Sequence, residues 1–288
     1  MVFTLSEVYN ISLEEFLNNS SRDNDIDIKD IKIEKFSSKL NFHKKEINTL
    51  EKEMDKFSDV SSIEELLKGP HYVFMNGNNL VGYVIINKGS DTCYISSYII
   101  KSEYRGKGLG KDCFKLLLGF IKNKFKPKEI GLWVHTDNDP ARNIYYSFGF
   151  KSTDILLEGD VTKNKDSIAE TTTNKKLIDE LLDMYKTDLS DVSKEYLPDK
   201  SALVLIEDNK VSAGCSYNTY KEGNDKYLTL FYPVGRDENS LKIFLDNAIN
   251  RCKLDVNKFH MQHKLSYKLY NTVSKFGKPE QERLILKI

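Results

Sequence analysis

The residues of this chain that are best suited to chemistry lie in one run, Arg105-Gly-Lys-Gly-Leu-Gly110, between a predicted strand and a predicted helix. Glycine adopts backbone conformations with positive φ and lets a ligand approach the main chain closely. Gly106, Gly108 and Gly110 at the start of a helix would expose successive backbone N–H groups, which attract an anion together with the helix dipole. The run is therefore compatible with a pyrophosphate site, and equally with an ordinary tight turn between strand and helix.

Basic side chains at Arg105, Lys107 and Lys111 add positive charge to this run, but its spacing does not match the common nucleotide-binding motifs. A P-loop has G-x-x-x-x-G-K followed by Ser or Thr, whereas here Arg105 replaces the first glycine and Asp112 follows Lys111. A dinucleotide fingerprint has G-x-G-x-x-G, whereas the glycines here follow G-x-G-x-G. Both nucleotide interpretations fail on spacing.

Other candidate ligand-binding residues give weaker signals. His260 and His263 form H-x-x-H in a segment that is typical of a strand, where residues three apart face opposite sides. One metal ion could not easily bind both, so we expect no metal site. Four cysteines lie far apart among apolar neighbours, which predicts buried, reduced thiols: Cys93, Cys113, Cys215 and Cys252.

Composition excludes several classes of protein. The 288 residues favour two domains, and 40% hydrophobic with 30% charged residues is ordinary for a globular chain. Lysine plus arginine and aspartate plus glutamate both number 43, so there is no basic excess for an extended nucleic-acid surface. We expect no membrane span, because no apolar run approaches eighteen residues, and no secretory signal in the acidic stretch 1–21.

Hydrophobic periodicity predicts an α/β (α+β) protein with a mixed, mostly antiparallel sheet flanked by helices. The first half has the order strand, helices, three antiparallel strands, helix, strand, helix, strand. Capping boxes at Ser12 and Ser62 predict two short helices, the first within a helical extension over about 1–30. The other elements are predicted at 31–36, 47–57, 72–75, 80–86, 93–100, 109–121, 130–135 and from 140.

The second half repeats this order with little sequence identity. A polar stretch over 159–176 separates the halves, so we predict domains of 1–160 and 161–288. The elements of the second domain are predicted at 177–185, 202–206, 211–214, 227–232, 241–249, 259–263, 267–274 and 284–288.

The glycine run resembles the acetyl-coenzyme A loop of the GCN5-related N-acetyltransferase (GNAT) superfamily, Gln/Arg-x-x-Gly-x-Gly/Ala, through Arg105, Gly108 and Gly110. A second family element follows at a suitable distance, with Asn138, Ala141, Tyr145 and Gly149-Phe150 in its characteristic positions. The resemblance covers about 31–150 well and the second half only in outline. It implies the acetyl-CoA N-acyltransferase fold, here as two similar domains in tandem.

The resemblance also implies a binding site for acetyl-CoA. In this family the strand before the loop diverges from the next parallel strand, and its free backbone groups bind the pantetheine arm. The loop then holds the pyrophosphate, and the asparagine contacts the cofactor. The residues implied are Tyr98, Ile99, Ile100, Arg105, Gly106, Lys107, Gly108, Leu109, Gly110, Lys111 and Asn138.

By the same resemblance, Tyr145 lies near the cofactor sulfur. When an amine attacks a thioester, the leaving thiolate comes from a thiol of pKa about 8.5, and a tyrosine of pKa about 10 can stabilise or protonate it. The alternative is a helix aromatic that only packs, as we expect for Tyr146.

The base that deprotonates the amine is not apparent. Relatives that acetylate protein N-termini have a glutamate where this chain has Trp133, which cannot accept a proton. His135 lies on the same face of the strand and is the nearest ionisable substitute, with a surface role as the alternative. Glu103 and Asp137 are further candidates.

In the second half, Arg236-Asp-Glu-Asn-Ser-Leu241 replaces the glycine run, so two acids stand where a pyrophosphate would bind. We therefore predict a cytoplasmic monomer, with an active first domain and a degenerate second domain in a pseudo-dimer. It would transfer acetyl from acetyl-CoA to a small-molecule or peptide amine in a ternary complex. The alternative is a non-catalytic module that binds CoA or acyl-CoA and recognises a partner through its second domain.

Overall fold

The computed structural model describes residues 28–54, 68–106, 108–164 and 166–288. The two helices predicted from Ser12 and Ser62 lie outside these residues, as does the predicted N-terminal extension apart from a 3₁₀ turn at Ile28–Asp30. Residue contacts divide the chain into two compact units. Unit 1 holds the residues up to Trp133, Asn143–Phe150 and Ile285–Ile288; unit 2 holds Val134–Arg142 and Lys151–Leu284.

Unit 1 is built on the strands β1 (Ile31–Lys35), β2 (His71–Asn76), β3 (Asn79–Lys88), β4 (Thr92–Ile100) and β5 (Glu129–His135), whose last two residues fall in unit 2. The strands pair in chain order, and only β4 with β5 is parallel. The turn between β2 and β3 contains Gly77 at φ +56°, a left-handed conformation that glycine adopts without strain.

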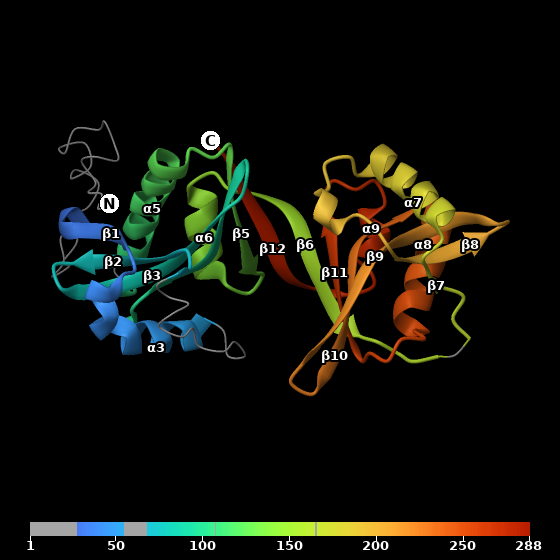
Figure 1. The fold of residues 1–288 in the computed structure, drawn as a ribbon, viewed down its shortest axis with the longest axis horizontal. Coiled ribbons are helices and arrows are strands. Elements are labelled where there is room, and N and C mark those ends of the chain that lie inside the picture. The colour runs from blue at the N-terminus through green and yellow to red at the C-terminus, as the bar shows by residue number, and fades with distance from the viewer. Residues whose placement is uncertain (1–27, 55–67, 107, 165) are drawn as a thin grey trace. The chain divides into compact units, whose positions relative to one another are not determined.

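Helices cover both faces of the unit 1 sheet (Figure 1). α3 (Lys44–Met54) packs through Ile47 and Leu50 on a core that contains Val73 and Tyr83 of the sheet. α5 (Leu109–Phe125) lies across the other face and buries nine of its residues, and α6 (Asp139–Ser147) follows β5. Because both faces are covered, the first five residues of β2 are all buried.

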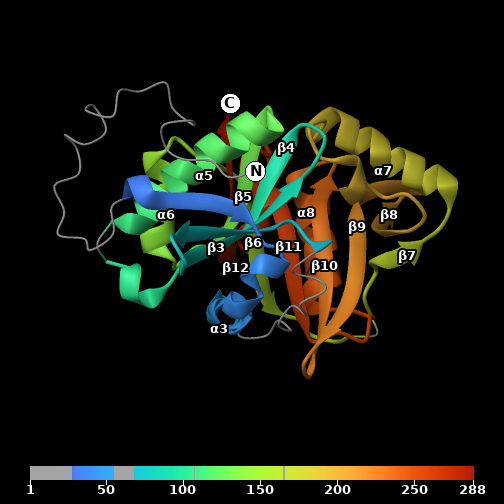
Figure 2. The same cartoon turned by 60° about the vertical axis from the view of Figure 1, so that its left-hand side comes forward.

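Unit 2 has a second mixed sheet, with β6 (Lys151–Asp160), β11 (Lys258–Lys264), β10 (Asp225–Gly235), β9 (Lys210–Glu222), β8 (Ala202–Glu207) and β7 (Glu170–Thr172) in that spatial order. β12 (Lys278–Lys287) lies beside β6, and only β10 with β11 is parallel among the pairs from β6 to β7. Figure 2 shows these long strands edge to edge. The helices are α7 (Lys175–Asp188), α8 (Glu238–Leu245), continued by a π-helical turn to Asn250, and α9 (Tyr270–Val273).

The predicted order of elements is present in both halves of the chain: three antiparallel strands, a helix and a parallel strand. This confirms the predicted mixed sheet flanked by helices. Three predictions were wrong in extent, one of them the strand predicted at 284–288, which begins at Lys278. The strand predicted at 211–214 continues to Glu222, where Gly223 at φ +56° turns the chain. The helix predicted at 267–274 contains only Tyr270–Val273.

The compact units do not coincide with the predicted segments 1–160 and 161–288. β6 lies before the predicted limit but belongs to unit 2, because its residues Asp154 to Asp160 pair with Lys264 to Lys258 of β11. The polar stretch after Gly159 is therefore not where the compact units separate. Division into two repeats stays a prediction.

All four cysteines are free and buried, as predicted. Burial is the main reason that the pKa values of Cys113 and Cys215 are raised, so these thiols are held protonated. None of the helices in the described part of the chain combines the length and apolar composition needed to cross a bilayer.

His263 is completely buried in unit 2, between two backbone carbonyl groups. Its Nε2 lies 2.7 Å from the oxygen of Pro233 and its Nδ1 lies 3.3 Å from that of Lys264. A neutral imidazole has one N–H, so it satisfies the shorter contact. Burial lowers the pKa of His263 from 6.5 to about 4, although both carbonyl groups favour the charged form.

We expect unit 2 to lose stability in acid because of His263. The unfolded chain takes up a proton near pH 6.5 and the folded chain only near pH 4, so the stabilisation is complete above pH 6.5 and falls through that window. The loss is roughly 3 kcal/mol at about 1.36 kcal/mol per pH unit. Denaturant unfolding at pH 7 and pH 4.5 should give a smaller pH dependence for His263→Gln than for the wild type. Equal pH dependence in the two proteins would contradict this account.

Candidate active site

The end of the parallel pairing between β4 and β5 opens the sheet of unit 1. The register runs from Thr92 opposite Glu129 to Ile95 opposite Leu132 and stops there. β4 continues to Ile100, still paired with β3 on its other side. The segment that includes the predicted residues Tyr98, Ile99 and Ile100 therefore has one edge that is not paired with β5, which leaves backbone groups for a ligand.

The loop after β4 adopts the backbone conformation that its glycines permit. Gly106 has φ +77° and Gly108 has φ +82°, both in the left-handed region. A side chain there would cost about 1–2 kcal/mol per residue. Lys107 between them lies outside the described residues. The glycine pattern predicted this conformation.

The N-terminus of α5 has no side-chain cap. Gly108 occupies the N-cap position, where Ser, Thr, Asp or Asn would otherwise bond to a backbone N–H of the first turn. The first N–H groups of a helix have no partner within the helix, and the helix dipole gives this end a partial positive charge. Leu109 is buried and Lys111 is exposed, with its Nζ 5.9 Å from the ring centre of Phe148. This end of α5 is suited to bind an anion.

Two contacts fix the loop on β4. The hydroxyl of Tyr98 donates to the carbonyl of Gly110 at 2.5 Å. Arg105 donates from Nε to the carbonyl of Ile100 at 2.6 Å and from Nη2 to Glu53 at 2.6 Å. Gly110 itself has room for a side chain, since an added Cβ would lie 3.9 Å from its nearest neighbours. Arg105 thus acts on the loop through the backbone of β4 as well as through its charge.

Acidic residues of α3 and the loop neutralise a second basic side chain. Lys101 lies 2.7 Å from Glu46 and 2.8 Å from Glu103. Despite some burial, these contacts raise the pKa of Lys101 and lower that of Glu46. Glu103, one of the candidate bases, is therefore engaged in an ion pair.

Tyr145 lies in α6 with its ring against Phe114 of α5, at a centroid distance of 4.9 Å, and near Phe150 at 6.1 Å. It is 8% exposed, and no described residue forms a hydrogen bond with its hydroxyl. Burial raises its pKa to about 12. The hydroxyl is therefore protonated at neutral pH and free to donate to a bound ligand. Tyr146 is exposed, so the prediction that it packs was wrong.

Asn138 and His135 belong to unit 2, whereas the residues of the glycine loop belong to unit 1. The side chain of Asn138 accepts from the backbone N–H of Ala141 at 3.3 Å, as an N-cap of α6 does. His135 is exposed at the end of β5, with Nε2 3.5 Å from Nε2 of Gln281. Their predicted roles in cofactor binding and proton transfer stay predictions.

The matching helix of unit 2 has a different N-terminus. Asp237 caps α8, and its carboxylate accepts from the backbone N–H of Ser240 at 2.8 Å. This backbone hydrogen bond is the main reason that the pKa of Asp237 is lowered. A carboxylate of the chain itself thus occupies the position of a bound anion.

In unit 2 a buried tyrosine follows the end of the matching parallel strand pair. The parallel pairing of β10 with β11 ends at Phe231 opposite Gln262, and the next residue, Tyr232, has φ +51° and is 1% exposed. Its hydroxyl donates to Asp154 at 2.9 Å and accepts from Nε2 of Gln262 at 2.5 Å. This network was not predicted from sequence, because the two partners of Tyr232 lie 30 and 78 residues from it in the chain.

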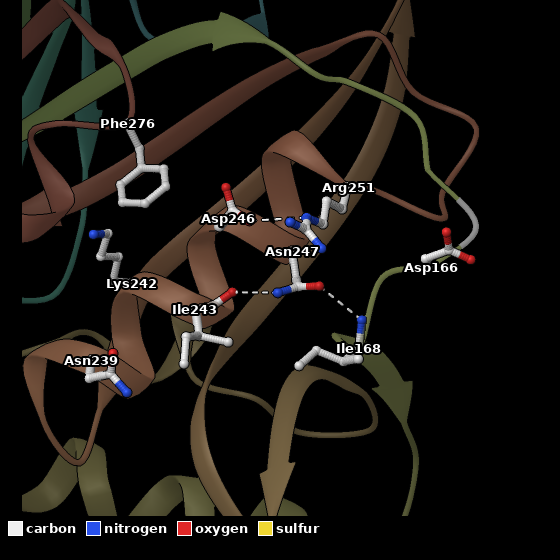
Figure 3. Close-up of a pocket in the computed structure, with 9 residues that line it drawn as sticks. All are labelled: Asp166, Ile168, Asn239, Lys242, Ile243, Asp246, Asn247, Arg251 and Phe276. Atoms are coloured by element: carbon white, nitrogen blue, oxygen red, sulfur yellow. Dashed lines mark hydrogen bonds and ion pairs between the residues drawn. The ribbon is translucent and has the colours of Figure 1, made fainter.

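A pocket of about 430 Å³ lies in unit 2 beside α8 and the turn after it (Figure 3). Asn247 donates to the carbonyl of Ile243 and accepts from the N–H of Ile168, and Arg251 pairs with Asp246. The side chain of Asn247 is thus bonded to backbone groups and Arg251 to Asp246, and none of these residues was predicted to take part in chemistry. The pocket does not include the glycine loop.

Comparison with known proteins finds similar sequences for the first half of the chain. The family model described as acetyltransferase (GNAT) family matches residues 37–150. A Bacillus subtilis protein named as a putative alanine N-acetyltransferase of ribosomal protein bS18 is 35% identical over 94 residues, which are 32% of this chain and 62% of the relative. A spermine/spermidine N(1)-acetyltransferase of the same species is 34% identical over 58 residues, 20% of this chain and 38% of the relative. The chain thus spans less than two thirds of either relative.

A solved structure extends the likeness of fold to most of the chain. The GCN5-related N-acetyltransferase from Sphaerobacter thermophilus aligns with a TM-score of 0.53 over 89% of this chain and 95% of its own, at 10% identity. At that identity the likeness concerns the fold alone, and it confirms the predicted fold class.

We expect Gly108→Ala to weaken anion binding at α5, because it strains the loop that presents the N–H groups. Gly77→Ala is the matched control, since Gly77 also has positive φ but lies in the turn between β2 and β3. Each substitution should lower the free energy of unfolding by about 1–2 kcal/mol. In amide NMR spectra, inorganic pyrophosphate should shift resonances of 105–111 in the wild type and Gly77→Ala, and much less in Gly108→Ala. Shifts confined to the start of α8 would contradict the assignment.

Proposed function

We propose that this chain, whose residues 37–150 match the model of the acetyltransferase (GNAT) family, transfers an acetyl group from acetyl-CoA to an amine. The observation that carries the proposal is the conjunction in unit 1 of a strand edge without a β5 partner, a loop with left-handed glycines and an uncapped helix N-terminus. The edge suits the amide groups of pantetheine, and the helix end suits the pyrophosphate.

In the proposed complex the loop residues bind the cofactor through backbone groups. N–H groups of the first turn of α5 donate to the pyrophosphate, with Lys111 as an exposed cation nearby. Free backbone groups of Tyr98, Ile99 and Ile100 bond the pantetheine arm. Arg105 holds the loop in the binding conformation through its bond to the carbonyl of Ile100.

Tyr145 supplies the acid in the proposed reaction. The amine nitrogen attacks the thioester carbonyl, a C–N bond forms, and the C–S bond breaks to leave a thiolate. A hydroxyl that is protonated at neutral pH and has no partner among the described residues is suited to bond that thiolate. Contributions of this kind are worth about 10²–10⁴ in rate.

The proposed acceptor is an amine of a small molecule or peptide. The curated relatives are named for a protein alanine and for spermine or spermidine, so both peptide and polyamine amines belong in the test panel. His135 at the end of β5 is the proposed base, acting directly or through water. We further propose that the chain works as a cytoplasmic monomer.

We expect one molecule of CoA to bind per chain. The proposed site lies in unit 1, whereas in unit 2 Asp237 caps the helix and the buried Tyr232 follows the last residue of β10 that is paired with β11. Isothermal titration with CoA should give a stoichiometry of one, and Gly108→Ala should weaken the affinity while Gly77→Ala should not. Two equivalent sites per chain, or none, would refute the proposed arrangement.

Replacement of Tyr145 by Phe should lower kcat by about 10²-fold or more, with little change in KM for acetyl-CoA. The packing against Phe114 is kept, so Phe removes only the hydroxyl. Thiol release with N-terminal alanine peptides and polyamines as acceptors provides the measurement, and Tyr146→Phe, in the exposed neighbour, is the control. Unchanged turnover in Tyr145→Phe would remove it from the reaction, and CoA binding without turnover for any amine would identify a non-catalytic module.

A further inference from the structure

Three possible metal ligands line up across neighbouring strands of unit 2. His260 of β11 is directly opposite Glu158 of β6, and Glu280 lies on β12 beside β6. One ligand atom from each side chain lies within 4.8 Å of the other two. Donors on one ion at bond lengths of about 2 Å are separated by roughly 3–4 Å, so small side-chain movements suffice to bring these atoms to a common ion.

Glu280 is the unusual member of this cluster. Its Oε2 is buried and has no hydrogen-bond partner among the described residues, although it points toward Nε2 of His260 at 3.4 Å. A buried carboxylate oxygen without a donor is costly. In the described part of the chain, no lysine or arginine forms an ion pair with Glu158 or Glu280. The imidazole of His260, whose Nε2 lies 3.4 Å from Oε2 of Glu280, is the basic group that faces this carboxylate.

His260 is oriented as a metal-binding histidine usually is. Its Nδ1 lies 2.9 Å from the hydroxyl of Tyr220, which leaves Nε2 facing Glu280. Tyr227 stacks on Tyr220 at 5.0 Å and lies 4.8 Å from the imidazole ring. A polar group on the second ring nitrogen fixes the tautomer and the ring orientation of a ligating histidine.

Of the two histidines in the H-x-x-H motif, only His260 belongs to this cluster. As predicted, His260 and His263 do not share a face: His260 is 18% exposed on its side chain, and His263 is completely buried. The partners of His260 are instead two glutamates from other strands, at sequence distances of 102 and 20 residues.

We propose that Glu158, His260 and Glu280 bind a divalent transition-metal ion of the Zn²⁺ class. One imidazole and two carboxylates suit Zn²⁺ or Co²⁺ better than Mg²⁺ or Ca²⁺, which prefer six or more oxygen ligands. Glu158 is exposed, so this ligand of the proposed site is in contact with solvent. The bound ion joins β12 to β6 and β11.

The test is titration of the chelator-treated full chain with ZnCl₂ by calorimetry, and with CoCl₂ by visible absorption. One ion should bind per chain, and excess Mg²⁺ should not displace it. Glu280→Gln and His260→Gln should each weaken binding at least tenfold, and Tyr220→Phe should weaken it by roughly tenfold as the loss of a second-sphere bond. Glu170→Gln, on the exposed strand β7, removes the same charge away from the cluster and should bind like the wild type.

Thermal unfolding gives an independent readout, because an ion that binds only the folded state raises Tm. Zn²⁺ should raise the Tm of the wild type and Glu170→Gln, and not that of Glu280→Gln. Zinc binding that stays within twofold of wild type in both Glu280→Gln and His260→Gln would overturn the proposal, as would no binding at micromolar zinc. Near-ultraviolet circular dichroism of each variant verifies that its fold is intact.

Discussion

The exposed backbone N–H groups at the start of α5 are the constraint on which the candidate site depends. The first N–H groups of a helix have no partner in a preceding turn, and the N-cap residue Gly108 has no side chain to accept from them. The surrounding contacts keep this end open and in place: Arg105 ties the loop to the last residue of β4, and Tyr98 bonds the carbonyl of Gly110. The cost of an uncapped helix is offset when an anion supplies the acceptors.

Unit 2 has the same order of strands and helix as unit 1, but its helix α8 has a different N-terminus. Asp237 supplies the acceptor for α8 from within the chain, and the buried Tyr232, at φ +51°, follows the last residue of β10 that is paired with β11. The N-cap position therefore holds a carboxylate in α8 and a glycine in α5, although both helices stand between two parallel strands.

Sequence reasoning located the elements and the glycine loop because both depend on local chemistry. Periodicity identifies buried faces, and three glycines at alternate positions predict positive φ values, which two of them have. The point where β4 and β5 separate was implied only by family resemblance, since the register depends on partner strands. The row Glu158–His260–Glu280 and the network around Tyr232 join residues far apart in the chain, and no local pattern reports them. The sequence showed Asp237 as an acid before a helix. That it caps α8 with its side chain, whereas α5 has no side-chain cap, is known only from the structure.

In the proposed reaction, burial limits what the hydroxyl of Tyr145 can do. A phenol of pKa about 12 and a free thiol of pKa about 8.5 differ by about 3.5 units, so complete proton transfer to a solvated thiolate is uphill by roughly 5 kcal/mol. A thiolate that forms within the same apolar surroundings is itself desolvated, which raises its pKa and narrows this gap. The proposed role of the hydroxyl is therefore first that of a hydrogen-bond donor to charge that develops on sulfur as the C–S bond breaks. The packing of its ring against Phe114 gives apolar surroundings, in which such a hydrogen bond is stronger than in water.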